Sequence, residues 1–239
     1  MKGMKLTVGV LALAMVLSSC GGMNNTGKGA LIGTTAGAAA GTGLGALIGK
    51  LTGNTKMGTG IGAAAGAAVG ATAGTLIGRK MDKAAKAAAA VADVEVETTT
   101  DGKGLEAVKV TFDNGILFAV GKATLTTKAQ GSLKQFAENV LNVYTDCDVA
   151  ILGFASSDGS DATNLTLSQN RASAVRNYLT GTCGVQTSQI KSTEGYGEDP
   201  QYLIMDANGK EDRNASRRVE VYLYASDAMI AAANAGTLQ

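Results

Sequence analysis

The stretch GFASSDGSDATNLTLSQNRASAV, residues 153–175, decides the fold of this chain. It begins with the end of an apolar run over residues 148–154, DVAILGF, which is typical of a short buried strand. Ser, Asp and Gly then indicate a turn, and the spacing predicts a helix from about Asn164 to Thr180. The predicted apolar face of this helix consists of Leu165, Ala172, Val175 and Leu179. The helix also carries Arg171, and an arginine on a buried face needs a partner for its charge.

Strand and helix patterns continue on both sides of this stretch. Residues 94–98 and 105–112 alternate around an Asp-Gly signal and predict a β-hairpin. A second helix is predicted from about Thr126, with an apolar face of Leu133, Phe136, Ala137, Val140 and Leu141. The remaining predicted elements are strands near residues 190–195 and 217–224 and a helix over residues 227–235. We therefore expect an α+β fold, a β-α-β-α-β-β sandwich with a mixed sheet and helices on one side.

Two copies of a glycine-rich segment precede this globular part, within residues 29–80. Residues 29–50 and 58–79 align without gaps, and each has glycine at every fourth position. That spacing puts the glycines on one helix face, and such small-residue faces let helices in a bilayer approach closely. The repeat predicts a packed helical hairpin that is membrane-associated or self-associating; a flexible Gly/Ala linker is the alternative. Residues 81–93 are rich in alanine and predict a helical connector.

The first residues have the pattern of a bacterial lipoprotein signal peptide. Lys2 and Lys5 precede an apolar run that is too short for an ordinary membrane span. Leu17-Ser-Ser-Cys20 resembles a lipobox, which implies that residues 1–19 are removed and that Cys20 is acylated. Residues 20–28 are then a lipidated tether, and the absence of Asp after Cys20 favours the outer membrane. A plain secreted protein with an incidental cysteine is the alternative.

The composition excludes several classes of function. The 239 residues carry a formal net charge of +1 and include no His. Near-zero charge gives no footprint for nucleic acid. Without His, Ser-His-Asp catalysis and zinc sites with His ligands are excluded. We therefore expect a protein that is not an enzyme and has no catalytic residue, no metal and no cofactor.

Three motifs resemble those of the OmpA-like C-terminal domain. They are NLTLSQNRA (164–172), GYGE (195–198) and RRVE (217–220). The resemblance covers roughly residues 105–225, and we expect the domain to occupy residues 94–226, followed by a tail over residues 227–239. The order of lipobox, glycine zipper and OmpA-like domain is similar to that of YiaD-type OmpA-family lipoproteins. The family implies non-covalent binding to peptidoglycan from the periplasmic side, in a pocket for the diaminopimelate of the stem peptide.

The resemblance also implies the roles of individual residues. Arg171 matches the family arginine, whose guanidinium binds the diaminopimelate carboxylate through a bidentate fork. Asn164, seven residues earlier, supplies neutral hydrogen bonds. Arg218 or its neighbour Arg217 braces the pocket. The alternatives are a structural Arg171 that hydrogen-bonds nearby carbonyls or Asp158, and a surface ion pair at the double arginine.

Three positions depart from the family pattern. The acid that accepts the diaminopimelate ammonium is replaced by Ser156, one family asparagine by Gly121, and the asparagine before the double arginine by Ser216. Asp158 or Asp161, in the same loop, could substitute for the missing acid. Both can equally be solvated turn residues. Peptidoglycan binding is therefore expected with one half of the pocket weakened.

Two cysteines remain after Cys20. Cys147 and Cys183 are expected at the same end of the domain, and an oxidising compartment permits a disulfide between them. Two free thiols are the alternative.

These patterns lead to two functional hypotheses. The first is an outer-membrane lipoprotein that tethers the membrane to peptidoglycan. The second is an envelope assembly protein with a degenerate pocket that forms homo-oligomers through its glycine zipper. A hydrolase is a distant third.

Overall fold

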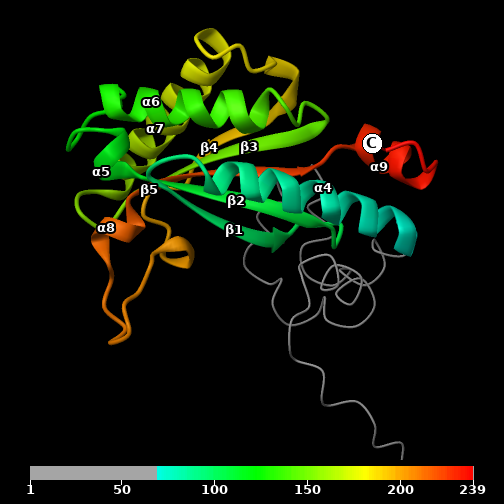
Figure 1. Ribbon diagram of the computed structural model, residues 1–239. Helices are drawn as coiled ribbons and strands as arrows, with labels where there is room; N and C mark the ends of the chain where they lie inside the picture. The colour runs from blue at the N-terminus through cyan, green and yellow to red at the C-terminus, as the bar shows by residue number, and fades with distance from the viewer. Residues whose placement is uncertain (1–68, 239) are drawn as a thin grey trace, which may run out of the picture.

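The computed structural model describes residues 69–238 of the chain, which form the coloured part of Figure 1. The predictions for the signal peptide, Cys20, the tether, the first glycine copy and most of the second lie outside the described residues. Within residues 69–238, no helix is both long and apolar enough to cross a membrane.

A five-stranded mixed sheet forms the centre of the domain (Figure 1). Its strands are β1 (Val94–Thr100), β2 (Glu106–Asp113), β3 (Cys147–Phe154), β4 (Ile190–Gly195) and β5 (Arg218–Ala225). The strand order is β1-β2-β5-β3-β4. Only the β3–β4 pair is parallel among the four pairings of this sheet, and the remaining pairs are antiparallel. The predicted hairpin over β1 and β2 is confirmed.

Helices pack against one face of this sheet around the main core, chiefly α4 (Ala71–Ala89), α6 (Thr127–Phe136), which continues as the π-helical turn η3 (Ala137–Leu141), and α7 (Asp161–Gly181). The shorter helical segments of the described residues are α5 (Asn114–Leu117), α8 (Arg213–Ser216), α9 (Asp227–Asn234) and the 3₁₀ turns η4 (Thr187–Gln189) and η5 (Pro200–Tyr202). Thr126 caps α6, since its hydroxyl accepts a hydrogen bond from the Ala129 N–H at 3.0 Å. The α+β class and the mixed sheet are confirmed. The order over β1 to β5 is β-β-α-β-α-β-β, because both strands of the hairpin join the sheet.

The period of two along each strand separates two apolar clusters. Val219, Val221 and Leu223 of β5 face the helices and belong to the main core. Tyr222 and Tyr224 face the other way. They share the second cluster with Ala107, Ala150, Leu152 and Phe154. The predicted apolar face of α6 and η3 is confirmed, because Leu133, Phe136, Ala137, Val140 and Leu141 are all fully buried.

Helix α4 packs into the main core, although its residues belong to the end of the glycine repeat and to the expected connector. It contacts β1, β2 and α9. Its buried side chains recur every three or four residues, which places them on one helix face. They are Ala73, Ile77, Met81, Ala84 and Ala88, each at most 2% exposed. Residues 81–89, which were expected to form only a connector, are therefore part of the helix that packs on the sheet.

One predicted core residue of α7 is wrong. The helix begins at Asp161, and Leu165 is 52% exposed. The line that faces the core contains Asn164, Ser168, Arg171, Ala172, Val175 and Leu179. Polar residues therefore occupy positions where an apolar face was expected, and their partners explain why they do so.

The two cysteines of the domain are free, so the disulfide is not formed in this structure. Cys147 is buried at the start of β3, while the Cys183 thiol is paired with the Tyr178 hydroxyl. The Asn142 amide donates to the Cys183 carbonyl at 3.0 Å.

Candidate functional site

Helix α7 lies unusually close to the ends of β3 and β4. A Cβ atom at Gly195 would lie 2.2 Å from the backbone nitrogen of Gln169, so only glycine permits this approach. The Gln169 side chain accepts from the Gly195 N–H at 2.8 Å and donates to the Thr193 carbonyl at 3.2 Å. The Ser168 hydroxyl accepts from the Gly197 N–H at 2.9 Å. The two motifs that include these residues thus fix the first half of α7 against the sheet.

Asn164 holds the loop between β3 and α7. It is 4% exposed, and its Nδ2 lies 3.1 Å from the Ser156 carbonyl and 2.9 Å from the Asp158 carbonyl. The same nitrogen is 2.5 Å from Glu198 Oε2. An amide nitrogen has only two hydrogens, so these acceptors use all of its donor capacity. Asn164 is therefore a structural residue of the loop, with no donor left for a ligand.

Arg171 is the largest fully buried side chain of the domain, at 2% exposure. Its Nε donates to the Lys122 carbonyl at 3.0 Å, and its guanidinium carbon lies 5.3 Å from the centre of the Phe118 ring. Gly121 adopts φ +70°, a left-handed turn that presents the Lys122 carbonyl to Arg171. Gly121 thus acts through its backbone and contributes no side-chain contact.

The charge of Arg171 has no acidic partner among residues 69–238. None of the ion pairs within 4.0 Å in this range includes Arg171, and its two terminal nitrogens make no hydrogen bond to a described residue. Burial, and then the nearby charge of Arg217, lower the pKa of Arg171 to about 10. The guanidinium is still charged at neutral pH. A buried charge without a counter-ion is costly, which makes this the position where an anionic ligand gains most.

The loop acid Asp158 lies next to Ser156, the residue at the position of the missing family acid. Ser156 is 2% exposed, and its hydroxyl lies 3.2 Å from Asp158 Oδ2 and 3.3 Å from Arg217 Nη1. Asp158 pairs with Arg217 at 3.2 Å and with Arg213 at 2.9 Å. The structure therefore brings Ser156, Asp158 and Arg217 together, and Asp158 is bound by two other arginines.

Asp161 is used in a different contact. It lies in the first turn of α7 and hydrogen-bonds with Glu198, which raises the pKa of the Glu198 carboxyl. Asp161 is thus paired with Glu198.

Arg218 lies away from this cluster. Its Nε donates to Glu220 Oε1 at 2.6 Å, and its guanidinium carbon lies 4.1 Å above the Phe154 ring. Its Nη1 donates to the carbonyls of Tyr202 and Ser216. Of the two adjacent arginines, Arg217 reaches the site and Arg218 faces the second apolar cluster. The alternation of side chains in an extended segment was the signal that could have separated them.

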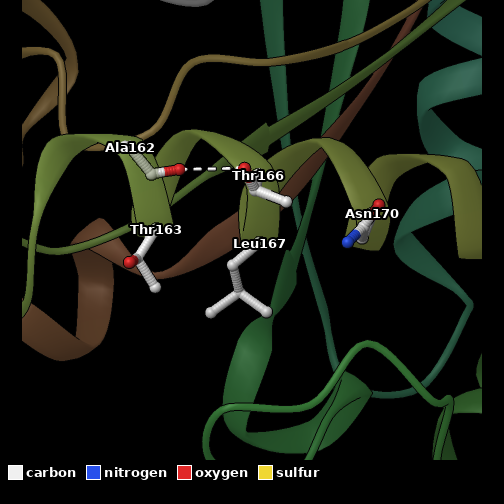
Figure 2. Close-up of a pocket in the computed structure, with 5 residues that line it drawn as sticks. All are labelled: Ala162, Thr163, Thr166, Leu167 and Asn170. Atoms are coloured by element: carbon white, nitrogen blue, oxygen red, sulfur yellow. Dashed lines mark hydrogen bonds between the residues drawn. The ribbon is translucent and has the colours of Figure 1, made fainter.

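A hollow of about 420 Å³ lies on α7 (Figure 2). Ala162, Thr163, Thr166, Leu167 and Asn170 line it. The Thr166 hydroxyl donates to the Ala162 carbonyl at 2.9 Å, as the dashed line shows. None of the five lining residues is charged, so this hollow offers no counter-ion to a charged ligand.

Two parts of the chain match models of known protein families. Residues 117–217 match the model of the OmpA family, and residues 36–85 match that of a glycine zipper. The C-terminal part of the chain is an OmpA-family domain, and a glycine zipper precedes it. The match to the OmpA family includes Gly121, Ser156, Asn164 and Arg171 and ends at Arg217. OmpA-family domains are not enzymes, which confirms the prediction of a non-enzyme.

Several relatives share the OmpA-family domain. Outer membrane protein P5 of Haemophilus influenzae is 40% identical over 95 residues, which is 39% of this chain and 26% of that protein. Outer membrane porin F of Pseudomonas aeruginosa is 30% identical over 132 residues, or 54% of this chain and 36% of that protein. The chain thus spans about a quarter to a third of the length of these relatives.

The chain is also similar to two solved structures. The OmpA-like domain of FopA1 from Francisella tularensis is 26% identical with a TM-score of 0.40, covering 56% of this chain and 85% of that one. The peptidoglycan-associated lipoprotein of Burkholderia pseudomallei is 25% identical with a TM-score of 0.38, covering 46% and 88%.

Proposed function

We propose that this chain is an outer-membrane lipoprotein whose OmpA-family domain faces the periplasm and binds peptidoglycan non-covalently. The family match and the outer-membrane relatives support the envelope location. Residues 1–19 are proposed as the signal peptide and Cys20 as the acylated residue. More than one acyl chain gives stable anchoring, so the protein would tether the outer membrane to the cell wall.

The buried, unpaired guanidinium of Arg171 carries this proposal. The fold positions it through the Lys122 carbonyl and the Phe118 ring and leaves both terminal nitrogens for a ligand. Two parallel N–H groups match the two oxygens of a carboxylate. A carboxylate of the peptidoglycan stem peptide, such as that of diaminopimelate, would supply the missing counter-ion.

Co-sedimentation with purified sacculi tests the proposal. The full chain is purified in detergent as wild type, Arg171→Gln and Arg176→Gln. Arg176 is a matched control, because it lies on the same helix and is partly exposed. Loss of a charge-assisted bond is expected to weaken binding of Arg171→Gln about ten- to a hundredfold, while Arg176→Gln binds like the wild type. Circular dichroism confirms that each variant is folded, and equal retention of all three proteins would exclude the Arg171 clamp.

The engagement of Asp158 by two arginines favours a second candidate function. The acid half of the pocket is occupied by the protein itself, as in an assembly protein with a degenerate pocket. In that case the glycine zipper would mediate homo-oligomers. Sedimentation velocity should then show a concentration-dependent oligomer that is lost when residues 29–57 are deleted. The deletion stops there because α4, from Ala71, packs on the sheet.

The lipid anchor has its own test. Cys20→Ala should abolish incorporation of labelled palmitate and release the protein from the membrane fraction. Labelling that persists in this variant would contradict the proposed anchor.

A further inference from the structure

We propose that the Arg171 site selects a carboxylate whose neighbouring nitrogen is uncharged or absent, and that it discriminates against a zwitterion. The inference rests on the proposed function, because it concerns the ligand of the same site. It follows from an asymmetry between the two halves of that site. The cationic half has N–H donors without a partner, and the acidic half is already neutralised.

The cationic half consists of Arg171 and the guanidinium of Arg217 near it. Arg171 is only 2% exposed, and no carboxylate of the described domain lies within ion-pair distance of it. Arg217 adds a positive charge close enough to lower the pKa of Arg171. A bound carboxylate would relieve both effects. A ligand ammonium at this position would instead add a further positive charge.

The acidic half would place a ligand ammonium next to two arginines that already neutralise Asp158. Asp158 Oδ1 is 2.9 Å from Arg213, and Asp158 Oδ2 is 3.2 Å from Arg217. Ser156 stands at the position of the family acid and offers a neutral hydroxyl, which is already shared between Asp158 and Arg217. A hydroxyl oxygen accepts a hydrogen bond from an amide N–H but does not neutralise an ammonium.

The acids that other segments bring to this loop are also engaged. Glu211 accepts from the Ser157 N–H at 3.1 Å and from its hydroxyl at 2.5 Å. Glu198 bonds to Asn164 and to Asp161. The ligand class that fits is therefore an acylated amino acid or a peptide carboxylate. In peptidoglycan this describes the terminal carboxylate of a stem peptide, or a diaminopimelate carboxylate next to an amine that a cross-link has acylated.

Isothermal titration calorimetry with two small probes tests the inference. Pimelate and meso-diaminopimelate have the same carbon chain and two carboxylates, but only the second carries ammonium groups. Each is titrated into the full chain as wild type, Arg171→Gln, Arg176→Gln and Ser156→Asp. We expect wild type and Arg176→Gln to bind pimelate about tenfold or more tightly than meso-diaminopimelate, because one charge-assisted contact is lost and one repulsion added. Arg171→Gln should lose this binding, and Ser156→Asp should shift the preference toward meso-diaminopimelate.

The outcomes separate this inference from the proposed function. Equal or tighter binding of meso-diaminopimelate to the wild type would overturn the inference and would assign the ammonium to the Asp161–Glu198 pair. Pimelate binding that survives in a folded Arg171→Gln, or no binding of either probe, would overturn it as well. Sacculus binding that persists in these cases leaves the proposed function standing. An Arg171-dependent preference for pimelate without sacculus binding would support the inference and contradict the tether.

Discussion

Replacing Ile77 with alanine tests whether the end of the glycine repeat belongs to the folded domain. Ile77 lies in α4, is 0% exposed and packs in the main core. Deletion of a buried aliphatic side chain to alanine costs about 2–5 kcal/mol, and the cost rises with the cavity that remains. The next residue, Gly78, already lies against β2, since a Cβ there would be 3.2 Å from Glu106 Oε2. The helix therefore has little room to move inward, and we expect a value in the upper half of that range.

Urea denaturation of the full chain in detergent, followed by far-UV circular dichroism, measures this loss. Arg79→Ala is the matched control on the exposed face of α4, and Val175→Ala in the core of α7 is the benchmark. The midpoint for Ile77→Ala should fall by about 1 M or more, given a slope of about 1–3 kcal/mol/M. Arg79→Ala should stay within about 0.5 kcal/mol of the wild type. If Ile77→Ala matches Arg79→Ala while Val175→Ala is destabilised, α4 is not part of the cooperative domain.

Three further predictions follow from the described contacts. Burial first, and then the neighbouring Asp82 carboxyl, raise the pKa of Glu106 to about 7 from 4.5. The folded state therefore favours the protonated Glu106 carboxyl. The stability of the domain is unreduced by this group below pH 4.5 and falls as the pH rises to about 7, where the buried carboxyl must ionise. The wild type should therefore lose stability between pH 5 and pH 8, and Glu106→Gln should lose about 1–2 kcal/mol less, a figure that allows for solvent screening. Urea midpoints at the two pH values measure the difference. Gly195→Ala should unfold the domain or lower its melting temperature by about 5 °C or more, because the added methyl group meets α7 backbone. Burial raises the pKa of Cys147 to about 12, so alkylation mapped by mass spectrometry should label it only after unfolding, and a native rate equal to the unfolded rate would refute its burial.

Much of the fold was predictable because its signals are local and mutually consistent. The apolar run of β3 and the three-four spacing of α6 each specify one element without reference to the rest of the chain. The hairpin of β1 and β2 follows from an Asp-Gly turn between alternating strands. Helix α4 was harder to place. A Gly/Ala repeat of period four suits a membrane hairpin and a helix on a soluble sheet equally well, and only packing against β2 distinguishes them.

The site was predictable in its residue types and less so in its geometry. The motif spacing singled out Arg171 and Ser156, and the structure places Ser156 in the loop after β3 and Arg171 on α7. The sequence left open which of Arg217 and Arg218 lies at the pocket, and the side chain next to Ser156 is that of Arg217. The ion pair between Asp158 and Arg213 could not be predicted from the sequence, because Arg213 lies in a segment far along the chain.

The polar face of α7 provides the strongest physical reason to regard Arg171 as the functional residue. Buried polar groups in folded proteins almost always have partners, so a complete set of partners marks a structural role. Ser168 receives the Gly197 N–H, and Asn164 binds the loop carbonyls, so both are satisfied within the fold. Arg171 is as deeply buried on the same face, yet only its Nε has a partner among the described residues. Because α7 satisfies its other buried polar side chains and leaves the charge of Arg171 without a partner, it supports the proposal that an anion binds at that position.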